Sequence, residues 1–270
     1  GWIWVLRFSN GITSAGVAAE DDLARDLRLE EGEPAWQRLL ARFPSVRAQF
    51  AEARAALPFV HAPRLGFRRA RAAGDGWALL PSAAAFADPL LSMGFPLALL
   101  GIQRLGLALA GDWGTPRFGK RVRDYGEATL AEADAAARLV GALHAAFDDF
   151  PLFAELSKLY FAAASYSESA RRLGKVSLAS SFLLSKHPAF GPALRRICDA
   201  ARRPLDPESR PRLLADVART IAPFDVAGLG DASRRNWFPV EAGDLRAGAA
   251  KLEATGDDVA RLLAASGFAA

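Results

Sequence analysis

The chain contains few residues of the kinds that build disulfide or metal frameworks. Among its 270 residues there are one cysteine, three histidines and one methionine. The single cysteine, Cys198, allows no disulfide within the chain, and we therefore expect a reducing, cytoplasmic setting. The histidines, His61, His144 and His187, lie far apart and have no ligand-like partner at helical spacing, so we expect no metal site.

Excess charge and long apolar runs are also scarce. The formal net charge is only +4, so nucleic acid is not an expected partner. A membrane-spanning helix needs about 20 apolar residues. The most apolar stretch lies between Asp88 and Arg104 and is interrupted by Pro89, Gly94 and Pro96. We predict a buried loop followed by a helix there, and no membrane span.

Several common catalytic motifs are missing. The sequence contains neither a Gly-x-Ser-x-Gly elbow nor a phosphate-binding loop. The stretch GLGDAS, residues 228–233, imitates the start of a dinucleotide fingerprint, but no clear helix follows, so we interpret it as a loop. Cys198 is expected to be a buried structural thiol. No catalytic residue can be assigned from these patterns.

What is present begins with β-type segments. Residues 2–8 are rich in aromatic and β-branched residues, residues 12–19 form a second such run without aromatics, and Asn10-Gly11 between them predicts a hairpin. A helix is predicted over residues 33–57, with a break at Pro44. A second hairpin is predicted within residues 66–80, turning at residues 74–76.

The remainder of the chain has helical periodicity. Apolar residues recur at helical spacing throughout it. The predicted helices cover residues 95–110, 129–147, 152–173, 177–185, 188–203, 208–221 and 257–266. The pattern as a whole predicts an α+β fold with a β-rich first third and a mostly helical remainder.

Two stretches resemble flavin-dependent halogenases and their relatives. GWIWVLRF, at residues 1–8, resembles a Trp-x-Trp-x-Ile-Pro signature, with Trp2 and Trp4 matching and Leu6-Arg7 in place of Ile-Pro. LLPSAAAFADPLLSMGFPLALLGIQRL, from residue 79, resembles the second flavin-contacting segment of that superfamily. The matching positions there are Ala83, Ala84, Phe86, Asp88, Pro89, Ser92 and Gly94. A softer resemblance to a recurring tail segment covers GLGDASRRNWFPV, residues 228–240.

The resemblance implies an FAD-dependent oxidoreductase, a halogenase or monooxygenase, acting on a small-molecule or carrier-bound organic substrate with the help of a flavin reductant. Residues 1–112 would be the C-terminal part of an FAD- and substrate-binding domain, and residues 113–270 a helical domain. The implied cofactor-binding residues are Ser82, Ala83, Asp88, Pro89, Ser92, Met93, Gly94 and Phe95. The implied substrate pocket consists of Trp2, Trp4, His61 and Leu91.

The sequence also departs from the family pattern. Pro81-Ser82 stands where the family has Gly-Asp, whose aspartate holds the flavin. Leu91 replaces the glutamate of tryptophan halogenases, which argues against free tryptophan as substrate. The glycine-rich dinucleotide motif and the halogenase lysine are not in the chain, so we expect a preceding half that carries them. Two alternatives remain open: a flavin-free module that binds an apolar ligand or a protein, and a flavoenzyme resembling geranylgeranyl reductases.

Overall fold

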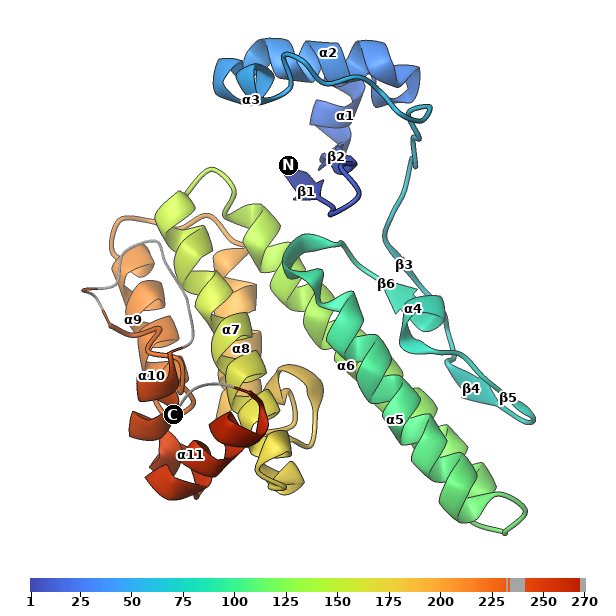
Figure 1. The fold of residues 1–270 in the computed structure, drawn as a ribbon, viewed down its shortest axis with the longest axis vertical. Helices are drawn as coiled ribbons and strands as arrows, with labels where there is room; N and C mark the ends of the chain where they lie inside the picture. Colours follow the sequence, from blue (N-terminus) through green and yellow to red (C-terminus); the bar gives the residue numbers. More distant parts are fainter. Residues whose placement is uncertain (232, 234–240, 268–270) are drawn as a thin grey trace. The chain divides into compact units, whose positions relative to one another are not determined.

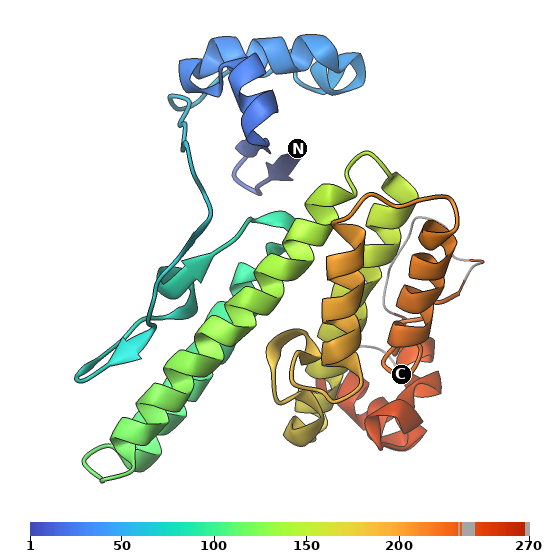
Figure 2. The ribbon, with the colours of Figure 1, turned by 180° about the vertical axis from the view of Figure 1, so that it is seen from behind.

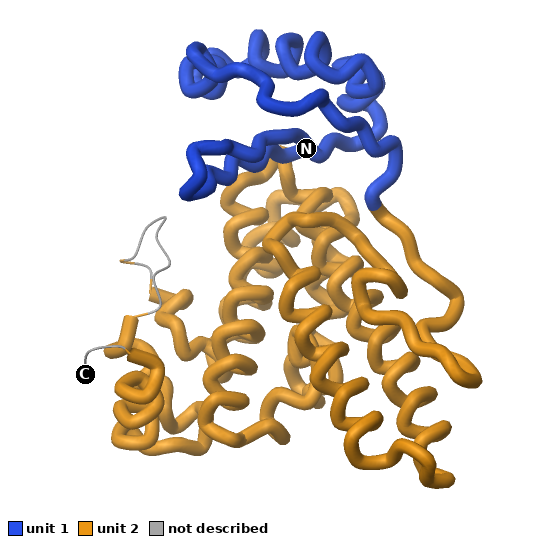
Figure 3. Tube along the Cα trace, turned by 45° about the vertical axis from the view of Figure 1, so that its right-hand side comes forward, with its two compact units in different colours: residues 1–65 blue, residues 66–270 orange. Residues whose placement is uncertain are grey.

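The structure is a computed structural model that describes residues 1–231, 233 and 241–267. It divides into two compact units, Gly1–Leu65 and Gly66–Ala270, coloured separately in Figure 3. Each unit is described by itself below. The sequence predicts a domain boundary between residues 112 and 113, whereas the structure divides after Leu65. The boundary at residue 112 stays a prediction about function.

The first unit begins with the predicted hairpin. Strands β1 (Trp2–Arg7) and β2 (Thr13–Ala18) pair antiparallel. Gly11 adopts a φ of 84°, and the Asn10 side chain accepts a hydrogen bond of 3.0 Å from the amide of Ile12. These are the local features that make Asn-Gly a turn former, because both residues tolerate left-handed backbone.

Two tryptophans cover one face of this hairpin. The rings of Trp2 and Trp4 lie 5.8 Å apart, as expected for alternate residues of one strand. Trp4 pairs with Gly16, and its ring lies directly over that glycine. A Cβ at position 16 would come within 2.2 Å of the indole, so only glycine fits beneath it.

Helices complete the first unit. They are α1 (Asp21–Leu27), α2 (Glu33–Arg42) and α3 (Pro44–Gln49), with a 3-10 turn, η1, at Leu29–Glu31. The predicted break before Pro44 is confirmed, because the proline ring is tolerated in the first turn of a helix. The predicted helix is too long, however: it ends at Gln49, and no helix or strand follows until β3. Helix α1 was not predicted.

The second unit contains small sheets. Strand β3 (Phe67–Arg68) pairs with β6 (Ala85–Phe86), and β4 (Ala73–Gly74) pairs with β5 (Trp77–Ala78). The second predicted hairpin is therefore confirmed, and it turns through Asp75-Gly76. Its strands are only two residues long.

Helices make up most of the second unit (Figure 1). They are α4 (Pro81–Ala84), α5 (Gly94–Asp112), α6 (Phe118–Ala145), α7 (Phe150–Arg172), α8 (Phe190–Ala201), α9 (Ser209–Ile221), α10 (Ala242–Ala247) and α11 (Gly256–Ala265). The 3-10 turns are η2 (Leu90–Ser92), η3 (Val176–Ala179), η4 (Phe182–Leu184) and η5 (Ala249–Leu252). Helices α5 and α6 lie along one another, and α6 also contacts α7 and α8, which pack on α9 (Figures 1 and 2).

The core of this unit lies where α6, α7 and α8 meet. Leu139, Leu143, Leu156, Phe190 and Ile197 are fully buried there. They belong to three helices whose apolar residues recur every three or four positions, so one face of each helix is removed from water. The helical remainder predicted from this periodicity is confirmed.

Two parts of the predicted fold are wrong. The first third is not β-rich, since residues 1–90 contain four α-helices, α1 to α4, and only short strands. The fold is mostly helical with small two-stranded sheets. Residues 177–185 form two 3-10 turns, η3 and η4, because Leu183 and Leu184 adopt left-handed backbone with φ of 54° and 49°.

Helix α5 is unusual in its apolar character. The segment Leu90–Asp112 is long and apolar enough to cross a membrane by length and composition alone, a criterion that core helices of soluble proteins also pass. Only 17% of its most apolar window is buried. The absence of a membrane span stays a prediction.

Candidate functional site

The segment that carries the family resemblance forms a tight turn before α5. Asp88 accepts a hydrogen bond of 2.7 Å from the amide of Leu90, so this carboxylate closes the turn. Leu91 and Ser92 then adopt left-handed backbone, with φ of 60° and 53°. Such backbone costs about 1–2 kcal/mol for each residue other than glycine. Strain of this kind persists where the surroundings hold it, and it is found most often at functional sites.

A cavity of about 390 Å³ opens beside this turn, within the second unit. Its walls come from β3, α4, β6, the start of α5 and the middle of α6. The lining is mostly apolar, and the residues that form it include Gly66, Phe67, Pro81, Ala85, Phe86, Ala87, Met93, Gly94, Leu97, Ala133, Ala136, Ala137 and Val140. A largely apolar cavity with few polar groups is the usual form of a small-molecule site.

Two pairs of charged or titratable side chains lie at the cavity, and all their members except His144 line it. Arg68 donates two hydrogen bonds to Asp134, at 2.6 and 3.0 Å, and both side chains are about half exposed. Asp88 lies deeper, and its Oδ2 is 3.3 Å from Nε2 of His144 on α6. Ser82, at the start of α4, adds a hydroxyl. These few groups can orient a ligand whose remaining surface is apolar.

The structure brings together half of the predicted cofactor residues. Ser82, Asp88, Met93 and Gly94 all line the cavity. The other four are adjacent in sequence but do not line it: Ala83, Pro89, Ser92 and Phe95. The contact of all eight residues with a cofactor stays a prediction.

The predicted substrate residues fall in both units. Trp2, Trp4 and His61 belong to the first unit. His61 is exposed and lies in the segment between α3 and β3, which contains no helix or strand. Leu91 is in the second unit, in the left-handed turn, and does not line the cavity. Their role in a substrate pocket stays a prediction.

Sequence reasoning missed the residues that α6 and β3 contribute. From the sequence, His144 is only excluded as a metal ligand, and Arg68 and Asp134 carry no prediction. No local signal reveals these residues, because His144 and Asp88 are separated by 56 positions and Arg68 and Asp134 by 66. The packing of α6 on α4, α5 and β6, and the pairing of β3 with β6, bring the two pairs together.

The start of α5 has properties that suit an electron-rich ligand. Gly94 lines the cavity, and a Cβ built there would meet nothing closer than the Phe86 ring at 4.0 Å. The space beside this backbone is therefore open. The first amides of a helix carry partial positive charge and have no partner within the helix. No side chain caps them in α5.

A buried polar cluster is centred on Glu132 of α6, the residue before the cavity-lining Ala133. Arg104 donates to both oxygens of Glu132, at 2.6 and 2.8 Å, and the amide of Phe182 donates to the same carboxylate at 2.8 Å. Glu132 is only 2% exposed. The hydrogen bonds with Glu132 raise the pKa of Arg104. The cluster connects α5 and α6 with η4.

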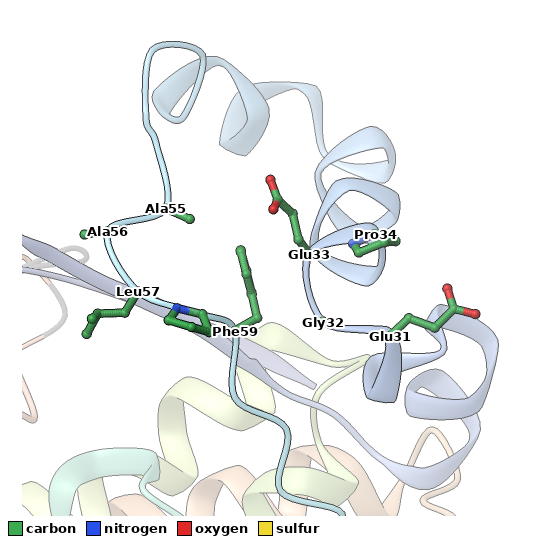
Figure 4. Close-up of a pocket in the computed structure, with 9 residues that line it drawn as sticks. Glu31, Gly32, Glu33, Pro34, Ala55, Ala56, Leu57 and Phe59 are labelled. Atoms are coloured by element: carbon green, nitrogen blue, oxygen red, sulfur yellow. The ribbon is translucent and has the colours of Figure 1, made fainter.

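The first unit has a separate hollow of about 520 Å³. Figure 4 shows that it lies between the turn at residues 31–34 and the extended segment at residues 55–59. Glu31 borders it and accepts a hydrogen bond of 2.6 Å from Arg38, which lowers the pKa of Glu31. None of the predicted cofactor or substrate residues lines this hollow.

Other predicted features can be located as well. Cys198 is buried, and desolvation raises its pKa to about 12, which confirms an unreactive structural thiol. Residues 228–231 form a loop around Asp225, whose carboxylate accepts from three backbone amides. Most of the tail resemblance, at residues 232 and 234–240, lies outside the described residues. In the part of the chain that the structure describes, no three His, Cys, Asp or Glu side chains gather as a metal site.

Comparison with known proteins finds that parts of the chain are similar to halogenases. It is 30% identical over 169 residues to the monodechloroaminopyrrolnitrin halogenase PrnC of Pseudomonas fluorescens, which covers 59% of this chain and 29% of that protein. It is 34% identical over 103 residues to the tetracycline 7-halogenase of Kitasatospora aureofaciens, covering 35% and 18% of the two chains. No protein-family profile matches.

The fold agrees with these sequence relatives. The chain is similar to the halogenase PltM in complex with phloroglucinol and FAD, with a TM-score of 0.64 and 19% identity. It is also similar to a second crystal structure of PltM, with a TM-score of 0.67 and 20% identity. In both cases the match covers 87% of this chain and about half, 52% or 53%, of PltM. The chain thus matches less than a third of the length of each curated relative and about half of the solved halogenase.

Proposed function

We propose that the chain is the cofactor-contacting part of an FAD-dependent oxidoreductase of the halogenase type, acting on an organic substrate. The observation that carries the proposal is the cavity beside α5. It gathers Ser82, Asp88, Met93 and Gly94, four residues of the segment that resembles a flavin-contacting segment. The sequence relatives are halogenases, and PltM has been crystallised with FAD.

The residues around the cavity fit a flavin ring. The cavity of about 390 Å³ falls within the usual size range of small-molecule sites. Its apolar walls exclude water, and the amides at the start of α5 favour negative charge on a bound ring. Bound FAD would supply the redox chemistry, while the protein orients the ring and keeps it dry. Ser82 offers a single hydroxyl where relatives have a carboxylate, so we expect weaker flavin binding than in those relatives.

The proposal also extends to the class of substrate. Leu91 argues for a phenolic or carrier-bound substrate over free tryptophan. Whether the product is halogenated or hydroxylated would depend above all on the lysine that the family resemblance implies. A cytoplasmic setting and a separate flavin reductant belong to the same proposal.

The test is to purify the protein from its complete reading frame and record its absorption spectrum. Bound flavin, released on denaturation and identified as FAD, is the expected result. Turnover with a reductant, oxygen, a halide and phenolic substrates, followed by mass spectrometry, then separates halogenation from hydroxylation. A protein that neither carries nor binds FAD would contradict the proposal and favour the flavin-free binding module.

Replacing Gly94 with alanine tests the site itself. The added methyl group would enter the cavity and touch no protein atom closer than 4.0 Å, so folding should not suffer. Because a close ligand would lose that space, we expect FAD affinity to fall about tenfold or more, equivalent to about 1.4 kcal/mol. Fluorescence titration of FAD measures this change. Gly106→Ala is the matched control, because it lies on α5 with nothing within 4 Å; equal affinities in the two variants would argue against a flavin at Gly94.

The exposed side of α5 supports a partner domain. Phe95, Leu99, Ile102, Leu109 and Trp113 are between 42% and 76% exposed. They recur at intervals of three, four and seven residues, which places them along one side of the helix. Single-domain proteins seldom leave so long an apolar surface in water. Since this chain matches about half of PltM, we propose that the dinucleotide-binding half covers this side.

Substituting Leu99 with glutamate tests that interface. In the complete protein we expect the charge to be buried without a partner and to destabilise by about 2–4 kcal/mol. In the isolated 270-residue chain Leu99 is 65% exposed, so the change should be within about 0.5 kcal/mol. Urea unfolding of both proteins measures the two values. Val176→Glu is the control, at another exposed apolar site. Equal effects of Leu99→Glu in both proteins would contradict the interface. If the isolated chain forms dimers and Leu99→Glu abolishes them, the surface binds a second copy of the chain instead.

A further inference from the structure

The contact between Asp88 and His144 joins two elements that are distant in sequence. His144 lies near the end of α6, one turn after Val140, which lines the cavity. Its Nε2 is 3.3 Å from Oδ2 of Asp88. The two side chains are only 26% and 10% exposed, so water screens the contact weakly.

Each oxygen of Asp88 has a different partner. Oδ1 accepts from the amide of Leu90, which closes the turn, and Oδ2 faces His144. The histidine is itself held by the ring of Phe147, at a centroid distance of 4.7 Å. The carboxylate is thus oriented from the turn on one side and from α6 on the other.

The turn that Asp88 closes leads directly into strained backbone. Leu91 and Ser92 have positive φ, and α5 begins two residues later at Gly94. Left-handed backbone at residues other than glycine is kept only where neighbouring contacts over-determine it. The Asp88 carboxylate is the group that connects this turn to α6.

We propose that His144 is a positioning residue of the flavin site: by holding Asp88 it fixes the turn at Leu90–Ser92 and the amides at the start of α5. This inference rests on the proposed function and extends it to a residue on α6. His144 acts through Asp88 and the turn, and it does not need to touch the cofactor. The contact also explains why an aspartate lies in the most apolar stretch of the chain.

The experiment compares His144→Gln with His144→Leu in the complete protein. The glutamine amide nitrogen takes a place close to that of Nε2 and can donate to Asp88, whereas leucine fills space without a donor. Fluorescence titration should show FAD affinity reduced about five- to tenfold by leucine, because the polar contact of 3.3 Å between Nε2 and the Asp88 carboxylate is lost. Glutamine should restore most of it. In the Asp88→Asn background, His144→Leu should add little further loss, because the two residues act as a unit.

Amide hydrogen exchange at residues 90–97 supplies a readout that needs no flavin. In His144→Leu we expect faster exchange at this turn, reversed in His144→Gln, while exchange in α8 is unchanged. Unchanged exchange together with FAD affinity within twofold of the wild type would overturn the positioning role. If the wild-type protein binds no FAD but exchange responds as described, the proposed function fails and the positioning of the turn by His144 stands.

Discussion

Replacement of Glu132 with leucine is expected to destabilise the second unit by about 3–5 kcal/mol. The substitution removes the carboxylate that accepts two hydrogen bonds from Arg104 and one from the amide of Phe182. The guanidinium, only a quarter exposed, would be left without that counter-charge, and the amide would lose its acceptor. Leaving buried donors unpaired costs more than the interaction itself contributes, which is why the expected loss is large.

Urea unfolding followed by circular dichroism measures this loss. Glu168→Leu is the matched control, because Glu168 also pairs with an arginine, Arg172, but on the surface of α7 with both side chains more than half exposed. Its effect should stay below about 0.5–1 kcal/mol. The double variant Glu132→Leu, Arg104→Met should recover part of the loss, because the guanidinium left without its counter-charge is then also removed. A cost for Glu132→Leu no larger than that of the control would show that the cluster is not stabilising.

Gly101→Ala is expected to disturb both stability and the cavity. A Cβ at this position of α5 would lie 2.4 and 2.5 Å from the Pro81 ring, far inside van der Waals contact. The proline ring is rigid, it is the first residue of α4, and it lines the cavity. Helix α4 must therefore move away from α5. Overpacking of this kind costs about 1–3 kcal/mol.

Gly106→Ala isolates the steric part of that effect. Both glycines lie on α5, and alanine is the better helix former by about 1 kcal/mol at each. Position 106 has no neighbour within 4 Å, so the substitution there should stabilise the helix. We expect the melting temperature to rise slightly for Gly106→Ala and to fall by several degrees for Gly101→Ala, with a parallel loss of FAD affinity. Identical melting temperatures would show that α4 yields without cost.

The features that sequence predicted correctly are those decided by neighbouring residues. Asn10-Gly11 makes its turn from its own backbone preferences, and Asp88 closes its turn on an amide two positions away. Gly174 ends α7 with a φ of 74°, as a glycine after a helix usually does. The resemblance of residues 79–105 to a flavin-contacting segment was recognisable because its signature is continuous in sequence.

The features that sequence did not predict depend on distant partners. Residues 177–185 have helical periodicity, but the amide of Phe182 is bonded to Glu132, fifty positions earlier, and the chain turns left-handed there instead. Helix α6 begins eleven residues before its predicted start at Thr129. Gly126 lies within that early part, and its lack of a side chain allows α6 to approach Ala73 of β4. His144 had no local signal because its partner is on another element.

The 28-residue helix α6 has a consequence for how this protein could be divided and recombined. Residues of α6 between Ala133 and Val140 form a wall of the cavity. Glu132, Leu139 and Leu143 of the same helix are buried against the other helical elements of the unit. A chimera joined between α5 and α6 would assemble the cavity from two parents. A junction after Leu65 would transfer all its walls together. Exchange of the helical part between relatives therefore also changes a wall of the cavity. The cavity and the helical part should be transferred together.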